Sequence, residues 1–196
     1  MKLIEQSWVW VQKPVNALQL IENAGRTCYK TEAKDDPEKF VKMILNKGHE
    51  SVIEHVNASV LFITNRGVTH ELVRHRLAAY SQESTRYVNY KNKDMEFITP
   101  VWLNNENKDM FVNQCQKVEE DYNKWIDLGY RPEQAREILT NALKTEIVIT
   151  CNLREWRHIF KLRTSKLAHP QMRNLMLDCL SGFKKEIPII FEDIEN

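Results

Sequence analysis

Glycine and proline are scarce in this chain, which contains only five Gly and six Pro in 196 residues. Collagen-like and low-complexity proteins need far more of both, so these classes are excluded. Hydrophobic residues make up 42% of the chain, which is enough to fill a core. No internal repeat or linker divides the sequence. We therefore expect residues 1–196 to form a single folded domain.

Paired cysteines are also missing. Cys28, Cys115, Cys151 and Cys179 are scattered, and no Cys-x-x-Cys pair predicts a zinc site. The first residues lack the apolar core of a signal peptide, and no apolar run has the length of a membrane span. We therefore expect a cytoplasmic protein (in the host cytoplasm if its source is a virus) with reduced thiols and no membrane partner.

An excess of charge is absent as well. The chain has 28 Lys and Arg against 27 Asp and Glu, for a net charge of +1. A protein that binds along nucleic acid usually has a basic excess over a whole face. Local basic clusters in a neutral chain fit small anionic ligands better. A nucleic-acid-binding module therefore remains only as an alternative that the overall charge disfavours.

Hydrophobic patterns predict a mixture of strands and helices. Strands are expected over residues 2–12, 56–64, 96–99 and 146–151. Helices are expected to start at Pro14, after Asp36, near Thr69, near 105, at Pro132, after Asn152 and at Pro170. The first of these helices is expected to end near Gly25, with residues 26–29 as a polar joint. The third is expected to run from Thr69 to Ala79.

Residues 74–87 (Arg-His-Arg-Leu-Ala-Ala-Tyr-Ser-Gln-Glu-Ser-Thr-Arg-Tyr) are the most informative stretch. They supply many hydrogen-bond donors for a phosphate and a polar heterocycle. If the stretch begins on a helix, Arg74 and Arg76 lie about 200° apart, so one should point into a pocket or a subunit interface. The alternative interpretation is a charged surface helix that runs into a polar loop.

Two further polar clusters stand out. Residues 48–55 (Gly-His-Glu-Ser-Val-Ile-Glu-His) lack the His-Glu-x-x-His spacing of a zinc site, so we expect no metal and interpret them as a capped turn with a functional His and Ser. Asn152 and Glu155 fit a variant of the helix capping box. The helix that follows is basic, with Arg154, Arg157, His158, Lys161 and Arg163. This helix could bind an anion at its N-terminus or could present a solvated basic face.

Four motifs in this order resemble the flavin-dependent thymidylate synthases, the ThyX family. The resemblance covers about residues 24–171. The motifs are Gly48–His55, the Arg74-His75-Arg76 group with seven residues before Ser84 and Arg86-Tyr87 behind it, Pro132–Leu139 with Arg136, and Asn152-x-Arg154 followed by Arg163 and His169-x-Gln171. A match with this many fixed residue types is far more specific than a lone glycine-loop pattern.

The resemblance implies an α+β fold with a central antiparallel sheet flanked by helices, assembled as a homotetramer with sites shared between subunits. It implies that dUMP becomes dTMP without a covalent enzyme nucleophile. Methylenetetrahydrofolate would supply the carbon, and FAD reduced by NADPH would supply the hydride. A second alternative is a ThyX-like protein that has lost catalysis and carries a flavin or a nucleotide.

The resemblance also implies site residues. Those expected at FAD are His49, Ser51, Arg74, His75, Arg76, Leu77, Gln82, Asn152, Leu153, Arg154 and His158. Those expected at dUMP are Glu71, Leu72, Val73, Arg74, Gln82, Glu83, Ser84, Thr85, Arg86, Arg136 and Arg163. Ser84 and Arg86 would hold the phosphate, with Ser84 as a binding hydroxyl. Arg163 would be catalytic, because a guanidinium at the N3/O4 edge of uracil stabilises the anionic pyrimidine that reacts.

Four residues depart from the usual family pattern. Glu71 stands where Gln is usual, and its carboxylate would repel a phosphate unless it pairs with an arginine. Gln82 replaces a frequent Glu, Cys28 a frequent Ser and His158 a common Asn. These departures concern individual contacts, since every arginine of the pattern is present.

Overall fold

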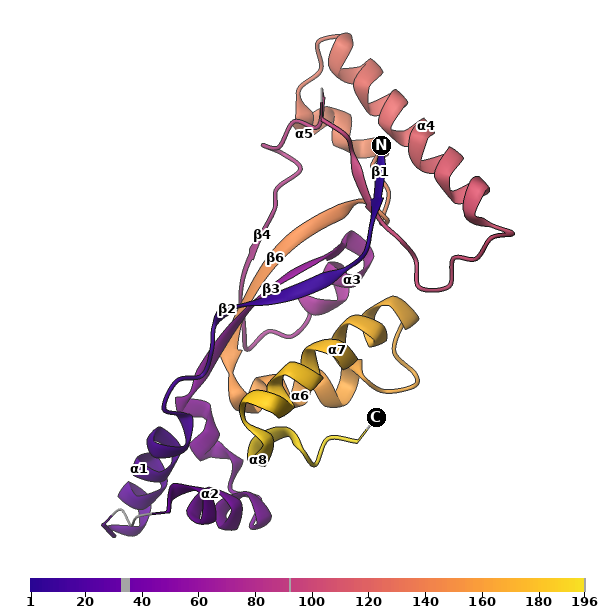
Figure 1. Cartoon of the computed structure of the whole chain (residues 1–196). Helices are drawn as coiled ribbons and strands as arrows, with labels where there is room; N and C mark the ends of the chain where they lie inside the picture. The colour runs from indigo at the N-terminus through magenta and orange to yellow at the C-terminus, as the bar shows by residue number, and fades with distance from the viewer. Residues whose placement is uncertain (33–35, 92, 196) are drawn as a thin grey trace. The chain divides into compact units, whose positions relative to one another are not determined.

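The structure is a computed structural model that describes residues 1–32, 36–91 and 93–195 (Figure 1). The chain forms two compact units. Unit 1 contains residues 1–8, 62–74 and 81–148, and unit 2 contains residues 9–61, 75–80 and 149–196. None of the helices within the described residues is long and apolar enough to cross a membrane. The expectation of a single domain over residues 1–196 stays a prediction.

A four-stranded antiparallel sheet has the strand order β2-β3-β6-β4. Its strands are β2 (Ser7–Gln12), β3 (Asn57–Asn65), β6 (Lys144–Asn152) and β4 (Ala79–Gln82). Along β6 buried and half-buried residues alternate, as expected for a strand with one face on a core. The predicted strands over 56–64 and 146–151 are confirmed, and so is the α+β class. The opening strand is divided into β1 (Lys2–Ile4) and β2, and β1 pairs in parallel with β5 (Glu96–Ile98).

Unit 1 has its own core beneath its longest helix. The helices of this unit are α3 (Arg66–Leu72), α4 (Lys108–Asp127) and α5 (Pro132–Ala135), which runs into the 3₁₀ turn η2 (Arg136–Ile138). Phe97 of β5 and Cys115 and Tyr122 of α4 meet in this core. The amino group of Met1 pairs with Glu119 of α4 at 2.7 Å. Helix α4 therefore packs inward through Cys115 and Tyr122, with Phe111 and Val118 partly buried against the same core.

The predicted helix from Thr69 to Ala79 is wrong beyond Leu72. Helix α3 ends at Leu72, residues 73–78 form turns, and strand β4 begins at Ala79. Sheet pairing takes over the following backbone, because the Glu83 N–H donates to the Glu146 carbonyl at 2.9 Å. Tertiary pairing has overridden local helix propensity here. Arg74 and Arg76 therefore do not lie on one helix, and the predicted separation of about 200° between them is wrong.

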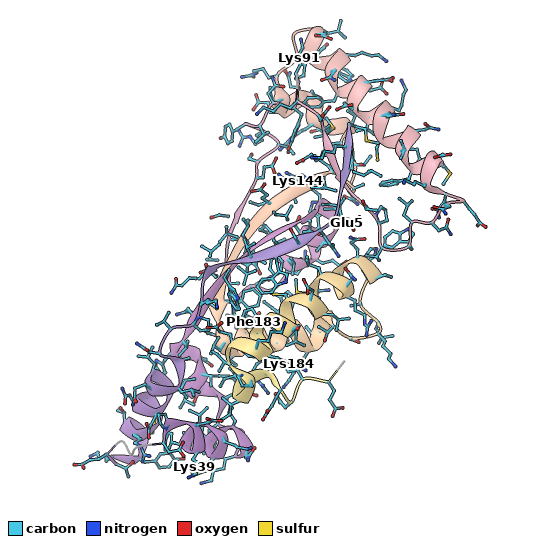
Figure 2. All side chains as sticks on the ribbon, in the orientation of Figure 1. Glu5, Lys39, Lys91, Lys144, Phe183 and Lys184 are labelled. Atoms are coloured by element: carbon cyan, nitrogen blue, oxygen red, sulfur yellow. The ribbon has the colours of Figure 1, made fainter. Side chains whose placement is uncertain are left out.

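Unit 2 contains most of the helices: α1 (Ala17–Tyr29), α2 (Pro37–Asn46), the 3₁₀ turn η1 (Glu50–His55), α6 (Leu153–Arg163), α7 (Pro170–Glu186) and α8 (Pro188–Phe191). Figure 1 shows α6, α7 and α8 together in orange to yellow. Trp156 and Phe160 of α6 pack against Phe183 of α7, which Figure 2 labels, with ring centroids 5.0 Å apart in both pairs. The Trp156 indole N–H donates to the Ala58 carbonyl at 3.1 Å, which ties this helix to β3.

The predicted helix starts after Asp36 and after Asn152 are confirmed by their caps, and α7 starts at Pro170 as predicted. The predicted start at Pro14 is wrong, because α1 begins at Ala17 and its N-cap residue makes no side-chain hydrogen bond to the first turn of the helix. The Asp36 side chain accepts from the Lys39 N–H at 3.1 Å, and the Asn152 side chain accepts from the Glu155 N–H at 2.9 Å. The predicted end of α1 is wrong, because the helix continues through Gly25 to Tyr29. A Cβ on Gly25 would lie 2.7 Å from both Ile44 Cδ1 and Phe40 Cε1. Glycine at this position allows α1 and α2 to approach closely and does not end the helix.

Candidate active site

A cleft of about 680 Å³ opens in unit 2 beside the first turns of α6. Its lining comes from η1, from the turn before β4 and from α6. The lining residues are Glu50, Glu54, Leu77, Asn152, Arg154, Glu155, Arg157, His158 and Lys161. A volume of this size is typical of sites for small molecules and cofactors. The first half of the predicted basic helix is therefore at a cleft, with acidic residues of η1 opposite it.

The cationic side chains of α6 have different surroundings. Arg154 is half-exposed and pairs with Glu54 at 2.5 Å and with Glu50 at 3.7 Å. Exposed ion pairs contribute little to stability, so an anionic ligand can replace Glu54 on Arg154. Arg157 is buried and makes two hydrogen bonds to Asp193, at 2.6 and 2.7 Å. Arg157 therefore belongs to the structure of unit 2, and neither the anion-site nor the solvated-face interpretation applies to it.

A buried polar chain lies next to this cleft. Arg163 Nε donates to His75 Nε2 at 3.0 Å, and Nδ1 of the same ring lies 3.6 Å from Glu155 Oε1. His75 and Glu155 are only 5% and 7% exposed. The exposed His158 ring packs edge-on against the His75 ring, with centroids 5.6 Å apart. The structure thus brings His75 and His158, which were expected at FAD, together with Arg163, which was expected at dUMP.

His75 is a neutral imidazole in this setting. Burial, together with the positive charges of Arg163 and His158, lowers the pKa of His75 to about 4. Burial also raises the pKa of Glu155, which His158 partly offsets. The 3.6 Å contact between His75 and Glu155 is longer than a hydrogen bond. With the lowered pKa of His75, this contact is better described as a neutral ring that faces a carboxylate than as an ion pair.

Three side chains in this cluster have the ligand types of a metal site. One ligand atom each from His75, Glu155 and His158 lies within 4.8 Å of the others. However, Nε2 of His75 already accepts from the Arg163 guanidinium. Two unit positive charges 4 Å apart repel by about 4 kcal/mol at an effective dielectric constant of 20. The charge around the cluster therefore disfavours a cation, and the expected absence of a metal stays a prediction.

The residues expected at the nucleotide lie mainly in unit 1, where several are already engaged. Gln82 Nε2 donates to the hydroxyl groups of Thr69 and Thr145 at 2.9 and 3.2 Å. The Glu83 carboxylate accepts from the Tyr90 hydroxyl at 2.9 Å and pairs with Lys144 at 3.4 Å. Both side chains are therefore engaged within unit 1, by Thr69 and Thr145 for Gln82 and by Tyr90 and Lys144 for Glu83.

Ser84 and Arg86 are better placed to meet a ligand. Ser84 Oγ accepts from the Arg86 N–H at 3.3 Å, and the Arg86 guanidinium lies over the Tyr87 ring. Arg86 is exposed, and its nearest carboxylate, Glu133 of α5, is 3.8 Å away. Arg136 follows directly after α5 and is partly exposed. Unit 1 thus contains a hydroxyl group and two exposed or partly exposed guanidinium groups, which are donor types that a phosphate site requires.

The two predicted sets separate between the units. Nearly all residues expected at FAD are in unit 2, except Arg74 and Gln82, and all residues expected at dUMP except Arg163 are in unit 1. Within unit 2, Leu77, Asn152, Arg154 and His158 line the cleft, and His49 contacts the Tyr29 hydroxyl at 3.2 Å. The side chains of Leu72 and Leu153 are fully buried, so these two residues could reach a ligand only through their backbone.

The sequence did not identify Glu155 as a site residue. Its position three residues after Asn152 predicted a carboxylate that caps α6. The Asn152 half of that cap is present, but the Glu155 carboxylate faces His75. Only the fold brings residue 75 to residue 155, so a pattern along α6 could not reveal this contact.

The fold and the site define an α+β protein with a charged cofactor-sized cleft and a separate cluster of phosphate-type donors. The family model described as "Thymidylate synthase complementing protein" matches residues 11–189. A flavin-dependent thymidylate synthase of Mycobacterium avium is 33% identical over 200 residues, which cover 90% of this chain and 79% of the relative. One of Mycolicibacterium gilvum is 34% identical, covering 95% and 83%. The chain belongs to the flavin-dependent thymidylate synthase family.

Solved structures agree with this fold. The UMP/dUMP methylase PolB from Streptomyces cacaoi, bound with 5-Br dUMP, matches with a TM-score of 0.82 and 19% identity, over 98% of this chain and 96% of that one. ThyX from Helicobacter pylori, with FAD and dUMP, matches with a TM-score of 0.78 and 21% identity, over 96% and 98%. At these identities the likeness shows the fold alone.

Proposed function

We propose that this chain is a flavin-dependent thymidylate synthase that converts dUMP to dTMP. Methylenetetrahydrofolate provides the one-carbon unit, and NADPH reduces the flavin. The observation that carries the proposal is the Arg163 guanidinium, held at 3.0 Å by a buried neutral imidazole beside a charged cleft. Family membership supports the assignment, because the relatives at 32–34% identity are flavin-dependent thymidylate synthases.

The cleft beside α6 fits FAD by volume and by donor chemistry. Arg154 and Lys161 provide positive charge for the pyrophosphate, and Asn152 and His158 provide polar groups for the ribose or the ring edge. Arg154 would exchange its exposed contact with Glu54 for the phosphate oxygens. FAD, when bound and reduced, supplies the hydride that completes the methyl group. The residues of this chain bind and orient the flavin and exclude water from it.

The nucleotide would be held by donors at its two ends. Ser84 and Arg86 bind the phosphate, and the Arg163 guanidinium faces the N3/O4 edge of the pyrimidine. Uracil C5 becomes nucleophilic only when negative charge develops on the ring, and a fixed guanidinium stabilises that charge. The phosphate donors and Arg163 belong to different units, and a homotetramer with sites shared between subunits is part of this proposal.

The thiols are consistent with a reaction that forms no bond to the enzyme. A nucleophilic cysteine must ionise to a thiolate, and burial opposes this. Burial raises the pKa of the Cys115 thiol to about 11, and it raises the pKa values of Cys151 and Cys179 as well. Cys28 is exposed, and its thiol lies 3.7 Å from the Ala24 carbonyl one helical turn away.

NADPH-dependent tritium release from C5-labelled dUMP tests the proposed function. We expect release by the purified chain with FAD, and a loss of about 10²–10³-fold for Arg163→Lys, which keeps the charge but loses the planar fork of donors. A chain that binds FAD but releases no tritium would be a carrier. A colourless chain with salt-dependent DNA binding would be a nucleic-acid-binding module. Labelled UMP in the same assay tests whether the ribonucleotide is also a substrate.

A further inference from the structure

Glu155 and Arg163 lie near opposite ends of the same helix and are bridged by a third residue. They are eight residues apart on α6, which corresponds to a rise of about 12 Å and a rotation of about 80°. Their side chains therefore share one side of the helix at different heights. The His75 ring contacts both, with Nε2 facing Arg163 and Nδ1 facing Glu155. The imidazole thus connects the carboxylate with the guanidinium.

The hydrogen-bond chemistry fixes the direction of this chain. A guanidinium can only donate, so Nε2 of His75 must be the acceptor of the 3.0 Å bond from Arg163. A neutral imidazole then carries its proton on Nδ1, the atom that faces Glu155 Oε1. If the proton were on Nε2, two donors would face each other in a buried place. The contact between Arg163 and His75 would then be lost.

Other contacts hold the ring in this orientation. The Tyr80 hydroxyl donates to the His75 carbonyl at 2.6 Å, and the His158 ring packs against the imidazole. These contacts act on the backbone and on the flat side of His75, but they do not distinguish its two nitrogens. Within the described residues, the carboxylate of Glu155 is the acceptor that faces Nδ1. Arg163 at Nε2 and Glu155 at Nδ1 therefore favour the same tautomer, and Glu155 acts on the nitrogen that carries the proton.

We propose that Glu155 is a positioning residue that holds His75 in the Nδ1–H tautomer and thereby orients Arg163. The proposal rests on the proposed function for its consequence, because Arg163 is the residue assigned to the pyrimidine. The 3.6 Å separation shortens when the cleft is filled, as catalytic hydrogen bonds of ligand-free enzymes commonly do. Through Glu155, the cleft wall beside α6 is coupled to the guanidinium at its far end.

The two variants Glu155→Leu and Glu155→Gln separate this role from simple packing. Leucine removes the acceptor, so we expect kcat to fall about 10²-fold, as for a misplacement of about 1 Å, while KM for dUMP changes much less. Glutamine keeps a carbonyl acceptor and should restore part of the activity. Glu22→Gln is the matched control, since Glu22 is a fully buried carboxylate that pairs with Arg26 at 2.8 Å within α1.

The deciding experiment is ¹⁵N NMR of the full-length chain with FAD, labelled at its histidines and without substrate. His75→Asn assigns the His75 signal among the six histidines. We expect a protonated Nδ1 and an unprotonated Nε2 in the wild-type chain and in Glu22→Gln, and a mixed or reversed tautomer in Glu155→Leu. If Glu155→Leu does not fold, Glu155→Gln provides the same comparison, because the neutral amide should favour the Nδ1–H tautomer of His75 less strongly than the carboxylate does.

Two results would overturn the proposal. One is a wild-type ring that carries its proton on Nε2, and the other is a Glu155 variant with unchanged tautomer and unchanged kcat. Failure of the proposed function has a different signature, because the NMR measurement requires no turnover. A wild-type chain that shows the Nδ1–H tautomer but makes no dTMP would refute the thymidylate synthase assignment and leave the tautomer result in place.

Discussion

Replacing Gly25 by Ala should destabilise unit 2, although alanine is the better helix former. The added methyl group would lie 2.7 Å from Ile44 Cδ1 and from Phe40 Cε1, about 1 Å inside normal carbon contact. Alanine gains about 1 kcal/mol of helix propensity over glycine. Overpacking costs about 1–3 kcal/mol, and two short contacts place Gly25→Ala near the upper end. We therefore expect Gly25→Ala to lower the free energy of unfolding by about 1–2 kcal/mol.

Urea unfolding tests this expectation, because the midpoint should fall while the slope stays constant. Ile44→Val removes the Cδ1 atom, one of the two atoms that would lie 2.7 Å from the new methyl group. In the Ile44→Val background, Gly25→Ala should lower the free energy of unfolding by roughly 1 kcal/mol less than in the wild-type chain. A coupling of this size is typical of residues in contact. A neutral or stabilising Gly25→Ala, or the same cost in both backgrounds, would refute the close approach of α1 and α2. Since α1 carries Tyr29, which contacts His49, the variant should also weaken FAD binding.

Two further changes have defined outcomes. Asp193→Asn should cost about 1 kcal/mol at neutral pH, since this half-exposed carboxylate pairs with the buried Arg157. Arg157 lowers the pKa of Asp193, so the advantage of the wild-type chain is present above about pH 4 and should disappear as the pH falls below it, as thermal unfolding at several pH values would show. Cys28→Ser should leave tritium release unchanged, and a loss of more than tenfold would contradict a reaction without a covalent cysteine.

The sequence predicted correctly those helix starts and strands that depend on neighbouring residues along the chain. The caps at Asp36 and Asn152 and the strands over 56–64 and 146–151 depend on neighbouring residues and are confirmed. Gly25 was misinterpreted, because a glycine that ends a helix and a glycine that admits a second helix have the same local pattern. The difference lies in Phe40 and Ile44, which only the tertiary fold brings to α1.

In the candidate site, too, local motifs identified some residues, and only the tertiary fold shows the partners of others. The family motifs assigned His75 and His158 to FAD and Arg163 to dUMP, and the structure shows these three side chains in contact around the His75 ring. The sequence could not distinguish the buried Arg157 from the half-exposed Arg154, since both belong to the same basic helix. Their roles depend on acidic partners from distant segments, Asp193 for one and Glu54 for the other.

Anaerobic reoxidation of the reduced flavin tests the central claim most directly. The purified chain with reduced FAD is mixed with dUMP and methylenetetrahydrofolate, the flavin absorbance is followed, and the nucleotide products are separated. We expect the flavin to be reoxidised only when both compounds are present, with one dTMP formed for each flavin oxidised. Flavin that stays reduced, or flavin that is oxidised without dTMP, would contradict the assignment of this chain as a flavin-dependent thymidylate synthase.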